Sequence, residues 1–101
     1  MDVTSLFQNT TPLFTALGDP ARQHIVVLLA EHSRSVNELA NSSTLSQPAI
    51  SHHLKILSHA GLVAPRRDGT RRIYSLTPHE GTKALKQLIG AIETACPEEK
   101  K

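Results

Sequence analysis

The first helix is predicted from the spacing of apolar residues. Apolar positions recur at helical spacing from Val3 to Leu17, and Thr11-Pro12 would either kink this helix or start another one. A helix of this kind cannot bury its apolar stripe alone, so we expect it to cover the domain core or a partner subunit.

A second helix is predicted from Ala21 to about His32. Asp19-Pro20 supplies its cap and its first position, where a missing amide costs little. Residues 25–30 are all apolar, which is typical of a central core helix. We expect Arg22 and Gln23, near its start, to be exposed.

Two short helices joined by a tight turn are predicted next. Ser35 and Glu38 have the S-x-x-E spacing of a capping box, which starts a helix at the following valine. Residues 41–44 are Asn, Ser, Ser and Thr, whose side chains bond to nearby backbone and favour a turn. Ser46 then caps a second helix, which tolerates Pro48 in its first turn and ends at a glycine.

The two faces of this second short helix differ in character. The apolar stripe contains Ile50, Leu54 and Leu57. The opposite stripe is short, hydrogen-bonding and almost uncharged, and contains Gln47, Ser51, Lys55, Ser58 and His59, with Pro48 and His52 alongside. A solvated face normally carries Glu, Lys and Arg, whereas Gln, Ser and His suit the edges of bases in a DNA major groove. The alternative is an ordinary solvent-exposed polar face. The arginine-rich segment that follows argues against this alternative.

A two-stranded hairpin is predicted from Pro65 to Leu76. Asp68-Gly69 is a strong hairpin-turn signal, and Ile73-Tyr74 favours a strand. The arginines on both sides of the tip are Arg66, Arg67, Arg71 and Arg72. They could be only a solubilising surface, but beside a neutral polar helix they match an arm that grips DNA phosphates.

The last helix is predicted to begin at Thr77-Pro78-His79-Glu80, which offers a threonine cap, a proline at the first position and a glutamate at the third. Its apolar stripe contains Leu85, Leu88, Ile89 and Ile92, with Ala84, Ala95 and Cys96. Pro97 would end it. We therefore expect residues 1–97 to form a single domain and residues 98–101 to be a frayed tail.

Composition narrows the class of protein. The chain has 101 residues and 39% hydrophobic content, which suits one small domain that oligomerisation would stabilise. Its formal charge is only +2, but residues 1–64 hold three Lys/Arg against four Asp/Glu, while four arginines crowd into seven residues of the hairpin. The longest apolar run is too short to cross a bilayer, and the acidic start lacks the basic region of a signal peptide. We therefore expect a cytoplasmic protein without membrane contact.

Catalysis and single-strand binding are not expected. The sequence has no phosphate-binding glycine loop, paired carboxylates or cysteine–histidine spacing, so we predict no enzyme and no cofactor. With no Trp, one Tyr and two Phe it lacks an aromatic platform for stacking unpaired bases. His79-Glu80 begins an H-E-x-x-H pattern, but Lys83 replaces the second histidine. We expect His24 and His32 to be partly buried rather than metal ligands.

Several short motifs lie at the predicted element boundaries. They are Leu17-Gly18-Asp19-Pro20-Ala21-Arg22, Glu38-Leu39-Ala40, Leu45-Ser46-Gln47-Pro48-Ala49-Ile50-Ser51-His52-His53-Leu54-Lys55, Gly61-Leu62-Val63 and Ile73-Tyr74-Ser75-Leu76. In this order, and across nearly the whole chain, they resemble the ArsR/SmtB family of winged helix-turn-helix bacterial repressors. The resemblance implies a mainly α fold with about five helices and a two-stranded wing. It also implies a homodimer that binds an inverted repeat in double-stranded DNA and blocks transcription until an inducer, unknown here, intervenes.

The resemblance and the charge pattern assign roles to residues. By the resemblance, the base-reading positions would be Gln47, Pro48, Ser51 and His52. From the charge pattern, the contacts to the DNA backbone would come from Lys55, Arg66, Arg67, Arg71 and Arg72. The dimer would pair through the first and last helices, with an interface containing Leu6, Phe7, Leu13, Leu85, Leu88, Ile89 and Ile92.

The chain departs from the family at its metal sites. A cysteine pair is typical of the thiol-sensing members, but Ala40 and Ser42 occupy those positions. The zinc-type positions on the last helix fall on Pro78, Glu80, Ala91 and Thr94. Only Glu80 could bind zinc, and its neighbour His79 could help only in a shifted register. We therefore expect neither a metal site nor a response to metals.

Two alternatives stay open. A winged-helix adaptor for protein interaction would share the fold without binding DNA specifically. Cys96, the single cysteine, could meet its dimer mate and sense redox state, although a lone cysteine near a helix end more often packs as an apolar group.

Overall fold

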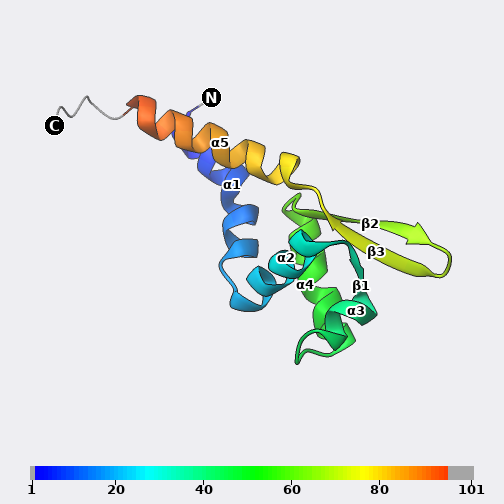
Figure 1. Cartoon of the computed structure of the whole chain (residues 1–101). Coiled ribbons are helices and arrows are strands. Elements are labelled where there is room, and N and C mark those ends of the chain that lie inside the picture. The colour runs from blue at the N-terminus through cyan, green and yellow to red at the C-terminus, as the bar shows by residue number, and fades with distance from the viewer. Residues whose placement is uncertain (1, 96–101) are drawn as a thin grey trace.

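The computed structural model describes residues 2–95, which form five helices and a three-stranded antiparallel sheet (Figure 1). The helices are α1 (Val3–Leu17), α2 (Pro20–Glu31), α3 (Val36–Asn41), α4 (Gln47–His59) and α5 (Pro78–Ala95). The strands are β1 (Arg34–Ser35), β2 (Val63–Asp68) and β3 (Arg71–Leu76). The predicted mainly α, winged helix-turn-helix architecture is confirmed. The expectations for Cys96, for a helix end at Pro97 and for a tail at 98–101 lie outside the described residues.

The N-terminal segment is one continuous helix rather than two. Asp2 caps it, because the carboxylate Oδ1 accepts the backbone N–H of Ser5 at 2.7 Å. Pro12 lies inside the helix and cannot donate a backbone hydrogen bond. The hydroxyls of Thr10 and Thr11 donate to carbonyls one turn earlier, at 2.7 and 2.9 Å, which ties this stretch to the preceding turn.

Arg22, at the start of α2, is buried, so the prediction that it would be exposed is wrong. Only 9% of the residue is exposed. Its Nε donates to the carbonyl of Ala16 and its Nη2 to the carbonyl of Thr15, both at 2.9 Å. The last carbonyls of a helix have no partner within the helix, and Arg22 supplies donors to those of α1. The expected burial of His24 and His32 is also wrong, because both are exposed.

The core forms where the inner faces of the helices meet. From α4, Ile50, Leu54 and Leu57 are fully buried, as the predicted apolar stripe requires. They pack with α2 and α3 through Ile25, which is 1% exposed, and Leu39, which is fully buried. Helix α2 is therefore a core helix as expected, although its Val27 is exposed.

The wing has one strand more than predicted. Strands β2 and β3 form the expected hairpin, with Val63 opposite Leu76 and Asp68 opposite Arg71, and Gly69 adopts a positive φ of 68° at its tip. Strand β1 pairs with the other edge of β3, in the order β1-β3-β2. A two-residue strand is too short to show an alternating pattern, so the sequence carries no signal for it.

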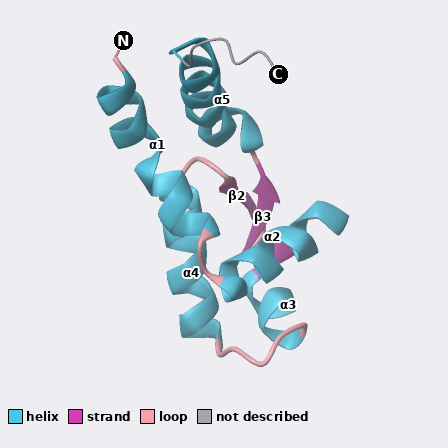
Figure 2. Ribbon diagram, turned by 90° about the vertical axis from the view of Figure 1, so that its left-hand side faces the viewer, coloured by secondary structure: helices cyan, strands magenta, loops and turns pink. Residues whose placement is uncertain are grey.

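Helix α5 and the N-terminal half of α1 lie side by side and extend away from the remaining helices, whereas the C-terminal half of α1 packs on the core (Figures 1 and 2). The molecule is correspondingly long, with principal extents of 54 × 24 × 21 Å. This shape leaves much of the surface of both helices without a neighbour within the subunit.

Two glycines bring the start of α5 against the end of α4. Gly61 follows α4 with a positive φ of 76°, and its carbonyl accepts the backbone N–H of Gly81 at 3.3 Å. A Cβ added to Gly81 would lie 2.7 Å from the carbonyl oxygen of Ala60, and one added to Gly61 would lie 3.0 Å from the nitrogen of Gly81. The two backbones are therefore in direct contact, and no side chain fits between them.

Among the helices of residues 2–95, none is both long and apolar enough to span a membrane.

Candidate nucleic-acid interface

The helix-turn-helix segment is built by the local hydrogen bonds that its sequence predicts. The Ser35 N–H donates to Oε1 of Glu38 at 2.8 Å, and the Glu38 N–H donates to Oγ of Ser35 at 3.1 Å, which is the predicted capping box. In the turn, the N–H of Leu45 donates to Oγ of Ser43 at 3.1 Å. Ser46 caps α4 by accepting the N–H of Ala49 at 3.3 Å.

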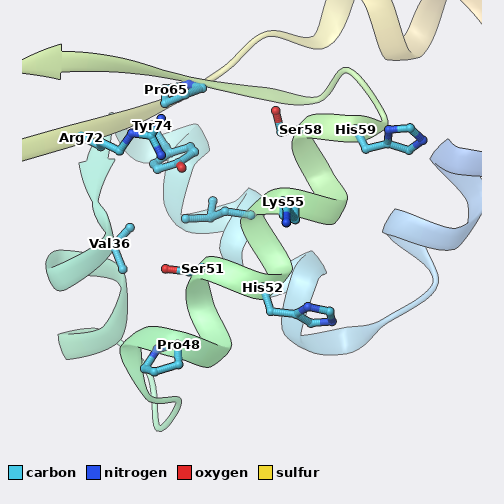
Figure 3. Close-up of a pocket in the computed structure, with 11 residues that line it drawn as sticks. Val36, Pro48, Ser51, His52, Lys55, Ser58, His59, Pro65, Arg72 and Tyr74 are labelled. Atoms are coloured by element: carbon cyan, nitrogen blue, oxygen red, sulfur yellow. The ribbon is translucent and has the colours of Figure 1, made fainter.

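The outer face of α4 is exposed along its whole length. The exposed side chains are Gln47, Pro48, Ser51, His52, Lys55, Ser58 and His59. This set includes every residue of α4 that the sequence assigned to base reading or to phosphate contact. Figure 3 shows Ser51 on the side of α4 that faces Val36, and His52 on the other side of the helix.

A groove of about 680 Å³ lies between the outer face of α4 and the wing (Figure 3). Helix α4 contributes Ser51 and Lys55 among others, and the wing contributes Pro65, Arg72 and Tyr74. The helix and the wing are therefore two borders of one concave surface.

A second groove, of about 600 Å³, continues this surface toward the start of α4. It is lined by Gln47 and Ser51 of α4, by Arg71 and Arg72 of the wing, and by the first turn of α3. Strand β3 thus brings arginines beside the uncharged N-terminal end of α4. This combination of neutral hydrogen-bonding groups and cations suits a duplex, whose base edges and phosphates lie side by side.

The four arginines of the wing are all exposed, and strand pairing divides them between two faces. Residues directly opposite each other in a hairpin share a face, and successive residues alternate. Arg67 and Arg72 are paired and share the face of Tyr74, which borders the α4 groove. Arg66 and Arg71 lie on the opposite face of the hairpin, although Arg71, beside its tip, also lines the second groove.

Gln47 is held by a residue that the sequence did not single out. Its amide Nε2 donates to Oδ1 of Asn37 in α3 at 2.7 Å. The two residues are ten positions apart, on different helices of the motif. No periodic pattern joins such positions, so only the packing of α3 against α4 reveals the contact.

Glu38 joins α3 to the wing as well as capping its own helix. Its Oε2 lies 3.4 Å from Nη2 of Arg71. The backbone N–H of Ser35 holds the pKa of Glu38 below its usual range, and the charge of Arg71 lowers it further. The sequence predicted the cap but not this ion pair.

Metal-ligating side chains do not gather in the described part of the chain. Within residues 2–95, no group of three or more His, Cys, Asp or Glu side chains lies close enough to hold a metal ion. His79 and Glu80 are both exposed in the first turn of α5.

The predicted dimer residues divide into two groups. Three of them are buried within the subunit: Leu6, Leu13 and Leu88 are 4%, 3% and 2% exposed. Leu85 is half-buried against the core. Leu6, Leu13 and Leu88 therefore have little surface left for a partner, and the assignment of these residues to a dimer interface stays a prediction.

Other apolar residues of the terminal helices remain exposed. On α1 these are Phe7 and Phe14, at 44% and 45%, and on α5 they are Ile89 and Ile92, at 46% and 45%. Phe7 and Phe14 are two helical turns apart and therefore share a stripe of α1. The sequence placed Phe7, Ile89 and Ile92 at an interface, but it did not separate them from their buried neighbours.

Comparison with known proteins places this geometry in a family. Residues 19–64 match the family model described as bacterial regulatory protein, arsR family. The HTH-type transcriptional regulator Rv2034 of Mycobacterium tuberculosis is 43% identical over 82 residues, which are 81% of this chain and 76% of that protein. The transcriptional repressor SdpR of Bacillus subtilis is 38% identical over 64 residues, 63% of this chain and 71% of that protein.

A solved structure extends the likeness to nearly the whole chain. It is the solution structure of the homodimeric winged helix-turn-helix DNA-binding domain of Mb0332 from Mycobacterium bovis, a possible ArsR-family regulator. The TM-score is 0.71 at 25% identity, covering 97% of this chain and 92% of that one. Because the family and these relatives are transcriptional regulators, the expectation that the chain is not an enzyme is confirmed. The predicted resemblance is confirmed too: this chain belongs to the ArsR family of bacterial regulatory proteins, which act as DNA-binding transcription regulators.

Proposed function

We propose that this chain is a homodimeric repressor that binds an inverted-repeat operator in double-stranded DNA. The observation that carries the proposal is the continuous surface formed by the outer face of α4 and strand β3, where uncharged hydrogen-bonding side chains lie beside arginines. Repression is supported by a relative, SdpR, that is itself named a transcriptional repressor.

Two kinds of side chain on this surface would contact two different parts of the duplex, its bases and its phosphates. The residues that would read bases are Gln47, Pro48, Ser51 and His52. The residues that would contact phosphates are Lys55, Arg66, Arg67, Arg71 and Arg72. Neutral groups at the start of a helix can lie in the major groove, while the cations on either side of them fix the position of the protein on the duplex.

Dimerisation is supported by the apolar surface of α1 and α5. Phe7, Phe14, Ile89 and Ile92 are each nearly half exposed. Large apolar side chains exposed on paired helices are typical of an interaction site, and a second copy of the chain presents the same helices. The related Mb0332 domain is described as homodimeric. Residues 1–97 would then form one domain for both DNA binding and dimerisation.

Regulation by metals is not expected, and the protein would act in the cytoplasm. Metals are not the inducer, because residues without ligating side chains occupy the family's positions at Ala40, Ser42, Ala91 and Thr94. A bacterial operator lies in the cytoplasm, which is where the protein would act.

Electrophoretic mobility shift with the promoter upstream of its own gene tests the proposal. A specific site is expected to bind at least about a thousandfold more tightly than a random duplex of equal length at the same salt concentration. Footprinting should then show two related half-sites. Equal and weak binding to both duplexes would instead support a winged-helix adaptor that contacts proteins.

A further inference from the structure

The amide of Gln47 is not free to rotate as an exposed glutamine normally is. It is the first residue of α4, and it lines the second groove together with Asn37, Arg71 and Arg72. Its Nε2 donates to Oδ1 of Asn37 at 2.7 Å. Both side chains are exposed, so this bond adds little to the stability of the fold. The bond lies at the edge of the proposed DNA surface, where it can instead fix the orientation of the Gln47 amide.

We infer that Asn37 is a positioning residue that determines which base Gln47 reads; this inference rests on the proposed operator binding. A glutamine has several rotatable bonds, and freezing them on binding costs entropy. A partner that already holds the amide removes part of that cost before DNA arrives. Asn37 thus acts through Gln47 and needs no contact of its own with a base.

The orientation of the held amide selects the base. One N–H of Nε2 is engaged by Asn37, which leaves the other N–H as a donor and Oε1 as an acceptor. Adenine presents the matching pair in the major groove, an N7 acceptor beside an N6 donor, and a glutamine amide can bind both at once. Guanine presents two acceptors at this edge, and one of them would face Oε1. The pair of Asn37 and Gln47 is therefore expected to specify adenine at one position of each half-site.

Substitutions at Asn37 separate orientation from folding. The side chain is exposed at the second position of α3, so Asn37→Leu, of similar shape but without an acceptor, is expected to leave the fold intact. Asn37→Ala is a second variant without an acceptor, and it suits a helix better. Asn37→Asp keeps an oxygen facing Nε2 and so is the conservative variant that should retain the orientation of Gln47.

The experiment selects an operator for the full chain from a library of random duplexes and then measures binding to every single base-pair variant. The wild type should prefer adenine at one position per half-site. Asn37→Leu and Asn37→Ala should lower that preference by roughly fivefold or more, the lower end of what a bidentate base contact supplies, and leave other positions unchanged. Asn37→Asp should keep the preference for adenine while weakening binding to all duplexes alike, because its charge repels phosphates. Adding Asn37→Leu to Gln47→Ala should change nothing further.

Three outcomes overturn the inference while leaving the proposed function standing, because an operator is still selected. One is an unchanged preference in both Asn37→Leu and Asn37→Ala when Gln47→Ala erases it. The second is independent, additive effects of the two residues, and the third is no effect of Gln47→Ala on preference. If no duplex is enriched at all, the proposed function fails and the inference fails with it.

Discussion

The guanidinium of Arg22 joins α2 to α4, because its Nη1 lies 3.2 Å from Nδ1 of His53. An arginine has no acceptor, so this hydrogen bond requires a His53 nitrogen without a proton. The same guanidinium binds two carbonyls at the end of α1. One buried cation therefore ties together α1, α2 and α4, beside the exposed His52 that is proposed to read DNA.

Replacing Arg22 by lysine is expected to destabilise the protein. Lysine keeps the charge but cannot donate in three directions from one rigid plane, and we expect the free energy of unfolding to fall by roughly 1–3 kcal/mol. Urea unfolding measures it. Gln23→Ala is the matched control, because Gln23 also donates to the end of α1, at 2.7 Å, but is exposed. If Arg22→Lys lowers the free energy of unfolding no more than Gln23→Ala does, Arg22 does not tie the three helices together.

Stability is expected to fall in acid. The backbone N–H of Arg22 holds the pKa of Asp19 below its usual range, and that of Ser35 does the same for Glu38. A carboxylate whose pKa is lower in the folded than in the unfolded state stabilises at neutral pH, and this contribution is lost as the pH falls below about 4. Urea midpoints measured from pH 7 to pH 3 should drop less steeply in Asp19→Asn and Glu38→Gln. Parallel curves for all three proteins would contradict this.

Charge on the exposed apolar surface of α5 should separate the subunits. Ile92→Glu is expected to give a folded monomer that binds operator weakly, because a buried charge at an interface is costly. Sedimentation velocity and circular dichroism measure both properties. Val27→Glu is the matched control, since Val27 is 57% exposed but lies on α2. A dimer that survives Ile92→Glu unchanged would move the interface elsewhere.

The same experiment at Leu88 should have a different result. Leu88 is 2% exposed and is covered within the subunit. Leu88→Glu is therefore expected to reduce folding itself, visible as a weaker helix signal in circular dichroism, rather than to yield a stable monomer.

Substitutions at the base-reading residues and at the phosphate-binding residues should have different effects on the salt dependence of DNA binding. Gln47→Ala or His52→Ala is expected to cost about 1–3 kcal/mol on the operator and to flatten the preference among base-pair variants, while the salt dependence of binding stays the same. Neutralising Arg67 or Arg71 should weaken operator and random DNA alike, and lower the salt slope by about one for each phosphate that the variant no longer neutralises. Preference that survives the α4 substitutions but disappears with a wing substitution would refute the assignment of the reading helix.

Metals should leave DNA binding unchanged. Zinc, cadmium, nickel and arsenite are expected to have almost no effect on operator affinity, because Glu80 is the only residue with a ligating side chain at the family's positions. Fluorescence anisotropy with each metal, against the same sample with a chelator, measures this. A large drop in affinity near one equivalent of any of them would show that the chain has a metal site after all.

The parts that could be predicted from the sequence are those held by neighbours in the chain. Ser35, Ser46 and Asp19 cap helices through bonds to residues two or three positions on, so their spacing is sufficient. The stripe of α4 likewise separated buried from exposed residues, because one helix face must meet the core.

The parts that could not be predicted depend on packing between distant segments. The stripe of α1 showed that Leu6 and Phe7 lie near a covered surface, but it could not show that only Leu6 is buried within the subunit while Phe7 stays exposed. The burial of Arg22 and the contact of Asn37 with Gln47 require the relative placement of helices, which no local pattern encodes.

The contact between Gly61 and Gly81 has a consequence for the length of the operator. Because backbone meets backbone there, the angle between α4 and α5 has little room to vary. In the proposed dimer, the place where two α5 helices meet would then set the separation of the two reading helices. Half-sites recognised by paired helices are about 34 Å apart along the duplex, one helical turn. Gly81→Ala alters none of the residues proposed to contact DNA, and it is thus expected to change which spacer length between half-sites binds best.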